Sequence, residues 1–199
     1  MRQEPNAFLE IRNAPKPGRP LRPHALLWPK VGTLLVPACL WLNTQRIAAL
    51  VVKRPVLSNV WWPLRPKNGT EIHEKALALW MNSTLGFISM LLKRGDTRGA
   101  WIKLKKPNLS TMRILDMKSL NAEQIGILEE SFDSLAGETL MPFPQMASDP
   151  VRAKIDAAIS KALNLPDLFT VRESLGREPM ITLCPIGSIK NEPVKSRKR

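Results

Sequence analysis

The chain has 199 residues, with 30 Lys and Arg against 17 Asp and Glu, which gives a formal net charge of +13. A hydrophobic share of 44% is enough for one substantial core and argues against a disordered chain. Two cysteines, Cys39 and Cys184, are too few for a disulfide scaffold and too far apart for a metal knuckle, so we expect the cytoplasm. No apolar run reaches the roughly 18 residues of a membrane span, and the proline-rich start is unlike a signal peptide, so we expect no membrane partner.

The N-terminal half predicts an irregular arm followed by short strands. Six prolines before residue 30 prevent a regular helix, so residues 1–27 should form a basic arm that enters the fold near Trp28. Apolar runs rich in β-formers, bounded by prolines, predict strands at 33–36, 47–52 and 57–62. An Asn-Gly turn at 68–69 then precedes Thr70, which can cap a helix.

Helical periodicity begins after this turn and returns near the C-terminus. A largely apolar stripe predicts one mostly buried helix over 71–93, followed by a polar loop at 94–99. Two short strands are expected at 101–104, where Trp101 and Lys103 share a face, and at 112–115. Asn121 and Gln124 form a capping-box pattern, and Asp149-Pro150 marks the start of a helix that continues to 164, with a short helix after Pro166.

These elements predict an α+β fold. A small, twisted, mostly antiparallel sheet with the 71–93 helix packed on it should be followed by a helical C-terminal region. We divide the chain into an arm (1–27), a sheet-and-helix region (28–118), a helical region (119–180) and a basic tail (181–199).

Charge is distributed unevenly along the chain. Residues 11–70 contain ten basic residues and no carboxylate, and residues 93–118 have eight basic residues against two acidic ones. Residues 119–180 reverse the sign, with ten acidic and five basic residues. A stretch without carboxylates either borrows acidic groups from the later helices or presents positive potential to a polyanion, most commonly a nucleic acid.

Catalytic signatures are missing from the sequence. There is no phosphate-binding glycine loop of the common types and no serine nucleophile elbow. The only histidines, His24 and His73, have no second ligand at metal spacing, so we interpret both as structural or exposed and expect no metal site. We therefore expect a non-enzymatic protein.

All six tryptophans lie between residues 28 and 101, within the basic region. Trp80 falls on the apolar helical stripe and should be buried in the core. In an extended strand Trp61 and Trp62 must point to opposite faces, so one of them can meet a partner. An exposed indole among arginines can stack on a base or enter a groove, whereas core packing is the simpler role for any single tryptophan.

Several sequence blocks follow one another along the chain: LNTQR at 42–46, RPVLSNVWWP at 54–63, ALALWMNSTLG at 76–86 and DTRGAWIKLKKP at 96–107, followed by Leu115-Asp116 and the Glu123-Gln124 helix. In this order they resemble the C-terminal part of N6-adenine DNA methyltransferases of restriction-modification and phage-defence systems. Together they cover roughly residues 25–180.

The resemblance implies a target-recognition domain that grips double-stranded DNA and confers sequence specificity on a methyltransferase. In that family a separate catalytic part binds S-adenosylmethionine and flips out the adenine. The family's glycine-bearing cofactor loop and its Asn/Asp-Pro-Pro-aromatic motif are missing from this sequence. We therefore expect no cofactor in this chain, and S-adenosylmethionine only in a partner catalytic domain or subunit.

Candidate DNA-contacting residues are sorted by their chemistry. Lys and Arg on long stems suit phosphate contacts, whereas Arg matches guanine, and Asn or Gln matches adenine, in bidentate geometry. By this criterion Gln45, Arg46, Asn59, Arg94 and Arg98 are candidates for base contacts. The full set comprises Gln45, Arg46, Lys53, Arg54, Asn59, Trp61, Trp62, Arg65, Lys67, Arg94, Arg98, Trp101, Lys103, Lys105 and Lys106.

Asn82 and Ser83 sit in an otherwise apolar helix, so we favour a structural role for this pair.

Two alternative functions also fit the sequence. One is a protein-interaction module whose basic face docks an acidic partner. The other is an RNA-binding module, favoured by the clustered tryptophans.

Overall fold

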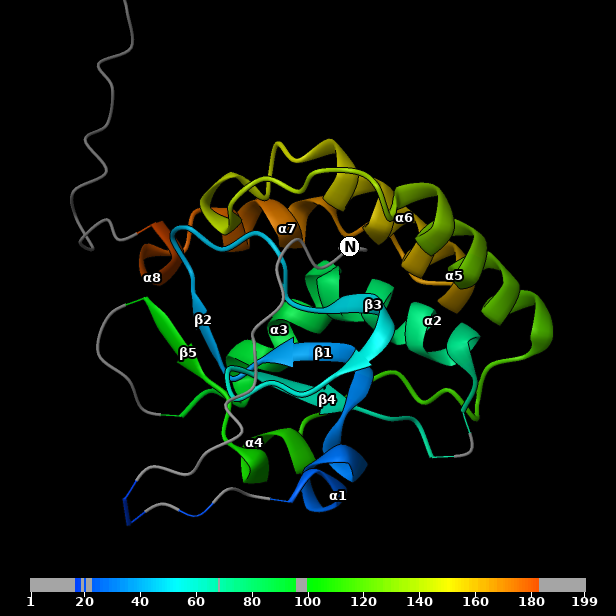
Figure 1. Ribbon diagram of the computed structural model, residues 1–199. Coiled ribbons are helices and arrows are strands. Elements are labelled where there is room, and N and C mark those ends of the chain that lie inside the picture. Colours follow the sequence, from blue (N-terminus) through cyan, green and yellow to red (C-terminus); the bar gives the residue numbers. More distant parts are fainter. Residues whose placement is uncertain (1–16, 19, 21–22, 68, 96–99, 183–199) are drawn as a thin grey trace, which may run out of the picture.

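A three-stranded antiparallel sheet in the order β3-β1-β4 lies at the centre of the fold (Figure 1). The computed structural model describes residues 17–18, 20, 23–67, 69–95 and 100–182. Its central strand β1 (Gly32–Pro37) pairs with β3 (Leu50–Val56) and with β4 (Trp61–Leu64). Alternation along β1 places Leu34 and Val36 in the core. The fold is α+β, as the sequence predicts.

A second, two-stranded antiparallel sheet continues from the first. Strand β2 (Cys39–Trp41) follows β1 after Ala38 and pairs with β5 (Trp101–Lys103). The Ala38 amide donates to the Val60 carbonyl at 2.9 Å, and the Ala38 carbonyl accepts from the Leu104 amide at 2.9 Å. Ala38 is therefore where both sheets meet. Strand β2 was not predicted from the sequence, because its three residues are too few for a recognisable pattern.

Two of the predicted strands have different boundaries in the structure. Strand β3 starts at Leu50, because the backbone of residues 48–49 binds the Asn82 side chain instead of a strand. Strand β4 starts at Trp61, since residues 57–60 form the preceding turn. Both strands contain a proline, Pro55 and Pro63, that we expected to end them. Edge strands tolerate proline, because its missing N–H faces no neighbouring strand.

The prediction of one helix over 71–93 is wrong. The chain forms α2 (Glu71–Asn82) and α3 (Thr84–Leu92), bent by 75° at Ser83. Ser83 is extended, and its hydroxyl accepts from the Gly86 amide at 3.2 Å and donates to the Trp80 carbonyl at 2.6 Å. A Cβ at Gly86 would lie 2.1 Å from the Trp80 carbonyl oxygen, so the bend requires glycine there.

No single helix in the part of the chain that the structure describes is both long enough and apolar enough to cross a membrane. Helices α2 and α3 reach that length and composition only as a bent pair, and most residues of α2 are buried within the protein.

The helices of the second half largely follow the prediction. Helix α5 (Ala122–Leu135) begins with the Asn121–Gln124 capping box, and α6 (Pro150–Leu163) is capped by Asp149. A short helix α7 (Phe169–Gly176) follows. The shorter elements are α1 (His24–Leu27), η1 (Trp28–Lys30), α4 (Lys106–Ser110), η2 (Phe143–Gln145) and α8 (Pro179–Thr182).

The strand predicted at 112–115 is wrong. Helix α4 uses Pro107 in its first turn and occupies the chain just before this segment, which is irregular in the structure. Met112 and Leu115 are nevertheless buried in the core. Their apolar spacing is therefore real, but it serves packing of an irregular segment and not a strand.

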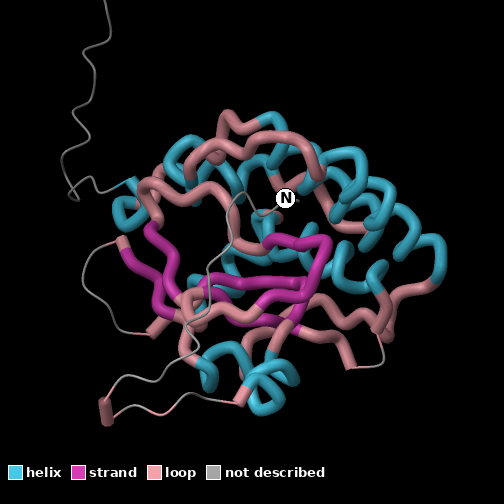
Figure 2. Tube along the Cα trace, viewed as in Figure 1, coloured by secondary structure: helices cyan, strands magenta, loops and turns pink. Residues whose placement is uncertain are grey.

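The longer helices α2, α5 and α6 gather on one side of the sheets, whereas the short helices α1 and α4 lie at the opposite end of the view (Figure 1 and Figure 2). Helix α2 packs against β1 and β3, and α5 and α6 pack on α2. One hydrophobic cluster runs from Leu34 in β1 to Ile181 in α8 and includes the buried Trp80. It therefore contains residues of both the 28–118 and 119–180 segments. Most of the predicted arm and basic tail lies outside the described residues.

Candidate nucleic-acid interface

The outer face of β5 presents cations next to an indole. Along β5 and just beyond it, Ile102 and Leu104 are buried, whereas Trp101, Lys103 and Lys105 are exposed. This alternation is what a strand produces when one of its faces covers a core. The predicted shared face of Trp101 and Lys103 is confirmed, and Lys106 is exposed at the start of α4.

A second tryptophan adjoins this face. The rings of Trp41 and Trp101, which are opposite each other in the β2–β5 register, contact edge to face with centroids 4.2 Å apart. Trp101 is 38% exposed. Cys39 is exposed opposite Lys103. The sequence analysis missed Trp41 as a neighbour of this face, because the contact depends on the unpredicted pairing of β2 with β5.

The β3–β4 segment carries most of the other candidates. Lys53 and Arg54 are exposed on β3, and Asn59 is exposed in the turn before β4. The Ser58 hydroxyl fixes this turn by accepting from the amides of Val60 at 3.2 Å and Trp61 at 3.1 Å. After β4, exposed Arg65 and Lys67 lead towards α2, and the Arg65 guanidinium donates to the Val31 carbonyl.

Trp62 joins this segment to β5. Its indole Nε1 donates to the Leu104 carbonyl at 2.8 Å. In the register with β1, Trp62 is opposite Val36 on the core side, and Trp61 is opposite Pro37 on the other side. The two indoles therefore point to opposite faces, as expected, and both are half-buried.

The remaining candidates lie elsewhere around the two-stranded sheet of β2 and β5, which we call the β2–β5 ribbon. Gln45 and Arg46 follow β2 at the end of the ribbon away from Lys105 (Figure 1). Arg46 is exposed, whereas Gln45 is half-buried, with its Oε1 buried and without a hydrogen-bond partner. Arg94 is exposed and donates to Met180 Sδ, next to Gly95, whose amide donates to the Lys103 carbonyl at 3.1 Å. Arg98 lies outside the described residues.

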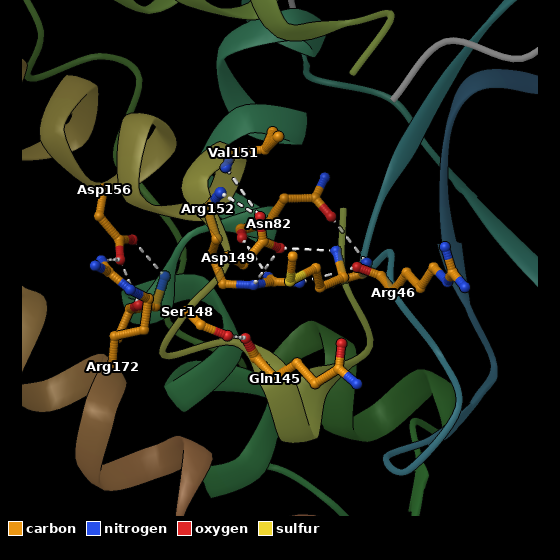
Figure 3. A network of polar contacts seen from close by, with 12 residues as sticks. Arg46, Asn82, Gln145, Ser148, Asp149, Val151, Arg152, Asp156 and Arg172 are labelled. Atoms are coloured by element: carbon orange, nitrogen blue, oxygen red, sulfur yellow. Dashed lines mark hydrogen bonds and ion pairs between the residues drawn. The ribbon is translucent and has the colours of Figure 1, made fainter. Parts of the chain in front are cut away.

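A separate set of charges is buried where α6 meets the α2–α3 bend (Figure 3). Arg152 is 0% exposed, and its Nη1 donates to the Asn82 carbonyl at 2.9 Å. One turn later on α6, Asp156 accepts from the Thr84 amide at 2.8 Å and from the Arg172 Nη1 at 2.6 Å. A cation thus meets the C-terminus of α2 and an anion the N-terminus of α3, the arrangement that helix dipoles favour.

Burial governs the electrostatics of Arg152. Removal from water lowers the pKa of its guanidinium to about 10, although Asp149 and Asp156 oppose the change. The guanidinium also lies 4.9 Å from the centroid of the Phe143 ring, which stacks on Phe87. Both Nη atoms of Arg152 are hydrogen-bonded, whereas its Nε has no hydrogen-bond partner and lies 3.7 Å from Asp149 Oδ2. Because a buried charge is costly to leave unpaired, this network belongs to the framework of the fold.

Several carboxylates of the helical region pair with cations on the helices. Lys75 on α2 binds Asp133 at 2.8 Å and Glu129 at 3.4 Å on α5. The hydrogen bond that Lys75 Nζ donates to the Asp133 carboxylate is the main reason that the pKa of Lys75 is raised. Asp156 binds Arg172, and Glu173 binds Arg177 at 2.6 Å. Cations of the helices thus pair with Glu129, Asp133, Asp156 and Glu173.

The structure confirms the structural role of Asn82 and Ser83. Asn82 Oδ1 accepts from the Ala48 amide at 2.9 Å, and Nδ2 donates to the carbonyls of Ala49 and Ala78, each at 2.8 Å.

Among the described residues no cluster of three or more His, Cys, Asp or Glu could hold a metal ion. Comparisons with protein-family models, curated proteins and solved structures found no match to this chain.

Proposed function

We propose that this chain is a non-enzymatic target-recognition module that binds double-stranded DNA and confers sequence specificity on a separate N6-adenine DNA methyltransferase. The main support is the arrangement of charge. Exposed Lys103 on β5, Lys105 just after it and Lys106 at the start of α4 lie on the opposite side of the molecule from α5, which carries four carboxylates and no Lys or Arg (Figure 1). S-adenosylmethionine would be bound by the separate catalytic part, and we expect both parts to act in the cytoplasm.

The β2–β5 ribbon carries side chains suited to contact the phosphate backbone of DNA. Residues beyond its two ends carry side chains suited to contact bases. Lysines on a rigid strand suit phosphates, which fix the orientation of a protein on a duplex without reading its sequence. Arg46 and Gln45 beyond one end of the ribbon, and Asn59 in the β3–β4 turn near the other, have the side chains that form bidentate contacts with guanine and adenine. Phosphate contacts and base contacts would then come from different elements.

A salt titration of duplex-DNA binding tests the proposal. Each phosphate contact contributes about 0.9 to the negative slope of log affinity against log salt concentration. The Lys103→Gln, Lys105→Gln double variant should therefore reduce the magnitude of this negative slope by roughly 1.8. The matched control is Lys154→Gln, Lys161→Gln, which removes the same charge from exposed positions on α6 and should leave the slope unchanged.

Specificity needs a second measurement. Selection from a random duplex pool should enrich one sequence motif, and Arg46→Ala should relax the choice of base at one position of it. A flat salt response, equal binding to heparin, or equal slopes for both double variants would refute DNA recognition by the ribbon. Preferential binding of single-stranded RNA, or of an acidic protein, would favour the alternative functions.

A further inference from the structure

The connection between β2 and β3, residues 42–49, is held in place by hydrogen bonds of its backbone groups. The amides of Ala48 and Ala49 donate to Asn82 Oδ1 at 2.9 and 3.4 Å, and the Ala49 carbonyl accepts from Asn82 Nδ2 at 2.8 Å. The Gln45 carbonyl accepts from the Phe143 amide at 3.1 Å. Local bonds to the Trp41 carbonyl form the turn after β2, whereas the bonds of Gln45, Ala48 and Ala49 to Phe143 and Asn82 hold the rest of the segment to groups that are distant in sequence.

Arg152 links this connection to the bend between α2 and α3. Its Nη2 donates to the Arg46 carbonyl at 3.0 Å, while its Nη1 donates to the Asn82 carbonyl at 2.9 Å (Figure 3). Arg152 is 0% exposed, so its own charge cannot reach an external ligand. Only a planar guanidinium presents two donors at this spacing, and a lysine ammonium is a single point of donation.

Side chains of this connection can be exposed even where its backbone is bound in the interior. Arg46 is exposed, although its carbonyl is bound in the interior. A bidentate contact with a base edge depends on direction, and recognition sites need their contacting groups held to within about 0.5 Å. A fixed carbonyl one bond from the Arg46 Cα limits the directions that its side chain can take.

We propose that Arg152 is a positioning residue, which holds the Arg46 carbonyl and thereby sets how Arg46 and Gln45 are presented to duplex DNA. The presentation to DNA rests on the proposed function, whereas the positioning of the connection does not. Arg172 provides a matched comparison. It is also buried and bonded to the α6 network through Asp156, but its contacts are with Asp156 and Phe169, outside the connection.

The first arm of the test needs no DNA. Amide hydrogen exchange of the full-length Arg152→Lys and Arg172→Lys variants is compared residue by residue. Exchange at Ala48 and Ala49 should be at least about tenfold faster in Arg152→Lys than in Arg172→Lys. Both variants are made with Gly126→Ala, a helix-interior change that meets no atom within 4 Å and should stabilise both equally. Equal exchange in the two variants would overturn the proposal.

The second arm is a double-mutant cycle of duplex-DNA affinity. Arg46→Ala should weaken binding about tenfold in the parent chain and in Arg172→Lys, but less than about threefold in Arg152→Lys. A tenfold loss in all three backgrounds would overturn the link between Arg152 and DNA presentation. If the parent chain shows no salt-dependent DNA binding while the exchange difference persists, the proposed function fails and the positioning by Arg152 stands.

Discussion

Charged residues have opposite roles on the two sides of this molecule. On the helical side Arg152, Asp156 and Arg172 are buried, and each binds named backbone or side-chain groups. On the ribbon, Lys103 on β5 and Lys105 just after it are exposed, whereas the alternate residues Ile102 and Leu104 are in the core. A buried charge must be satisfied internally, whereas an exposed charge keeps its hydration and can exchange it for a partner. Net charge alone does not distinguish these two roles.

The helical side needs its buried charges because the apolar helix is broken. A bend at Ser83 leaves carbonyls at the end of α2 and amides at the start of α3 without intrahelical partners. Arg152 binds the Asn82 carbonyl, and Asp156 binds the Thr84 amide. Arg152 and Asp156 are four residues apart on one face of α6. Together they supply bonding partners to the C-terminus of α2 and the N-terminus of α3.

Gly86→Ala should have the largest effect, because it attacks the bend itself. The new methyl group would lie 2.1 Å from the Trp80 carbonyl oxygen and 2.7 Å from the Met81 Cα, both of which are backbone atoms. We expect a loss of about 4 kcal/mol or more in the free energy of unfolding, measured with urea. The control Gly126→Ala should stabilise by about 0.5–1 kcal/mol. A loss below about 1 kcal/mol for Gly86→Ala would contradict the steric requirement.

Asp156→Ala should cost about 3–5 kcal/mol, the range for breaking a buried ion pair. The change leaves the Thr84 amide and the Arg172 guanidinium unpaired in the interior. Urea unfolding measures the loss. The control is Glu138→Ala at an exposed position, which should stay within about 0.5 kcal/mol of the parent chain. Equal effects of the two variants would mean that the buried charges are not required by the bend.

Lys75→Met tests the ion pairs between α2 and α5. Loss of the bonds to Asp133 and Glu129 should cost about 2 kcal/mol at neutral pH. Since the pKa of Lys75 is raised in the folded state, its stabilisation is complete below the ordinary value of 10.5 and is lost as the pH rises through the higher folded value.

The measurement for Lys75 is urea unfolding from pH 7 to 12. The difference in stability between the parent chain and Lys75→Met should narrow above pH 10.5. The same substitution at exposed Lys161 should show little difference at any pH. A gap that stays constant across this range would show that the charge of Lys75 is not what stabilises the contact.

The smallest effect on stability is expected for the ribbon. Lys103→Gln, Lys105→Gln should change the free energy of unfolding by no more than about 0.5 kcal/mol, because both side chains are exposed. The same variant is the one expected to weaken DNA binding in the salt titration. A large loss of stability here would place these lysines with the buried charges and remove the contrast between the two sides.

Local patterns predicted much of the fold. The alternation at 101–104 gave the strand β5 and the shared face of Trp101 and Lys103, and the capping residues Asn121 and Asp149 marked the starts of α5 and α6. Each of these signals is complete within a few residues. The break at Ser83 was not predicted, since the apolar stripe continues across it and its cause lies in Gly86 and in the distant α6.

Composition and short-range pattern determined the α+β class, the caps of α5 and α6, and the basic character of residues 11–70. Only the tertiary structure decided which charges are structural and which are exposed. Arg46 and Arg152 are alike as residues, yet one lies exposed on a connection and the other is buried beneath that same connection. The physical reason is that burial depends on contacts 106 residues apart, between α6 and the segment after β2, which no local pattern contains.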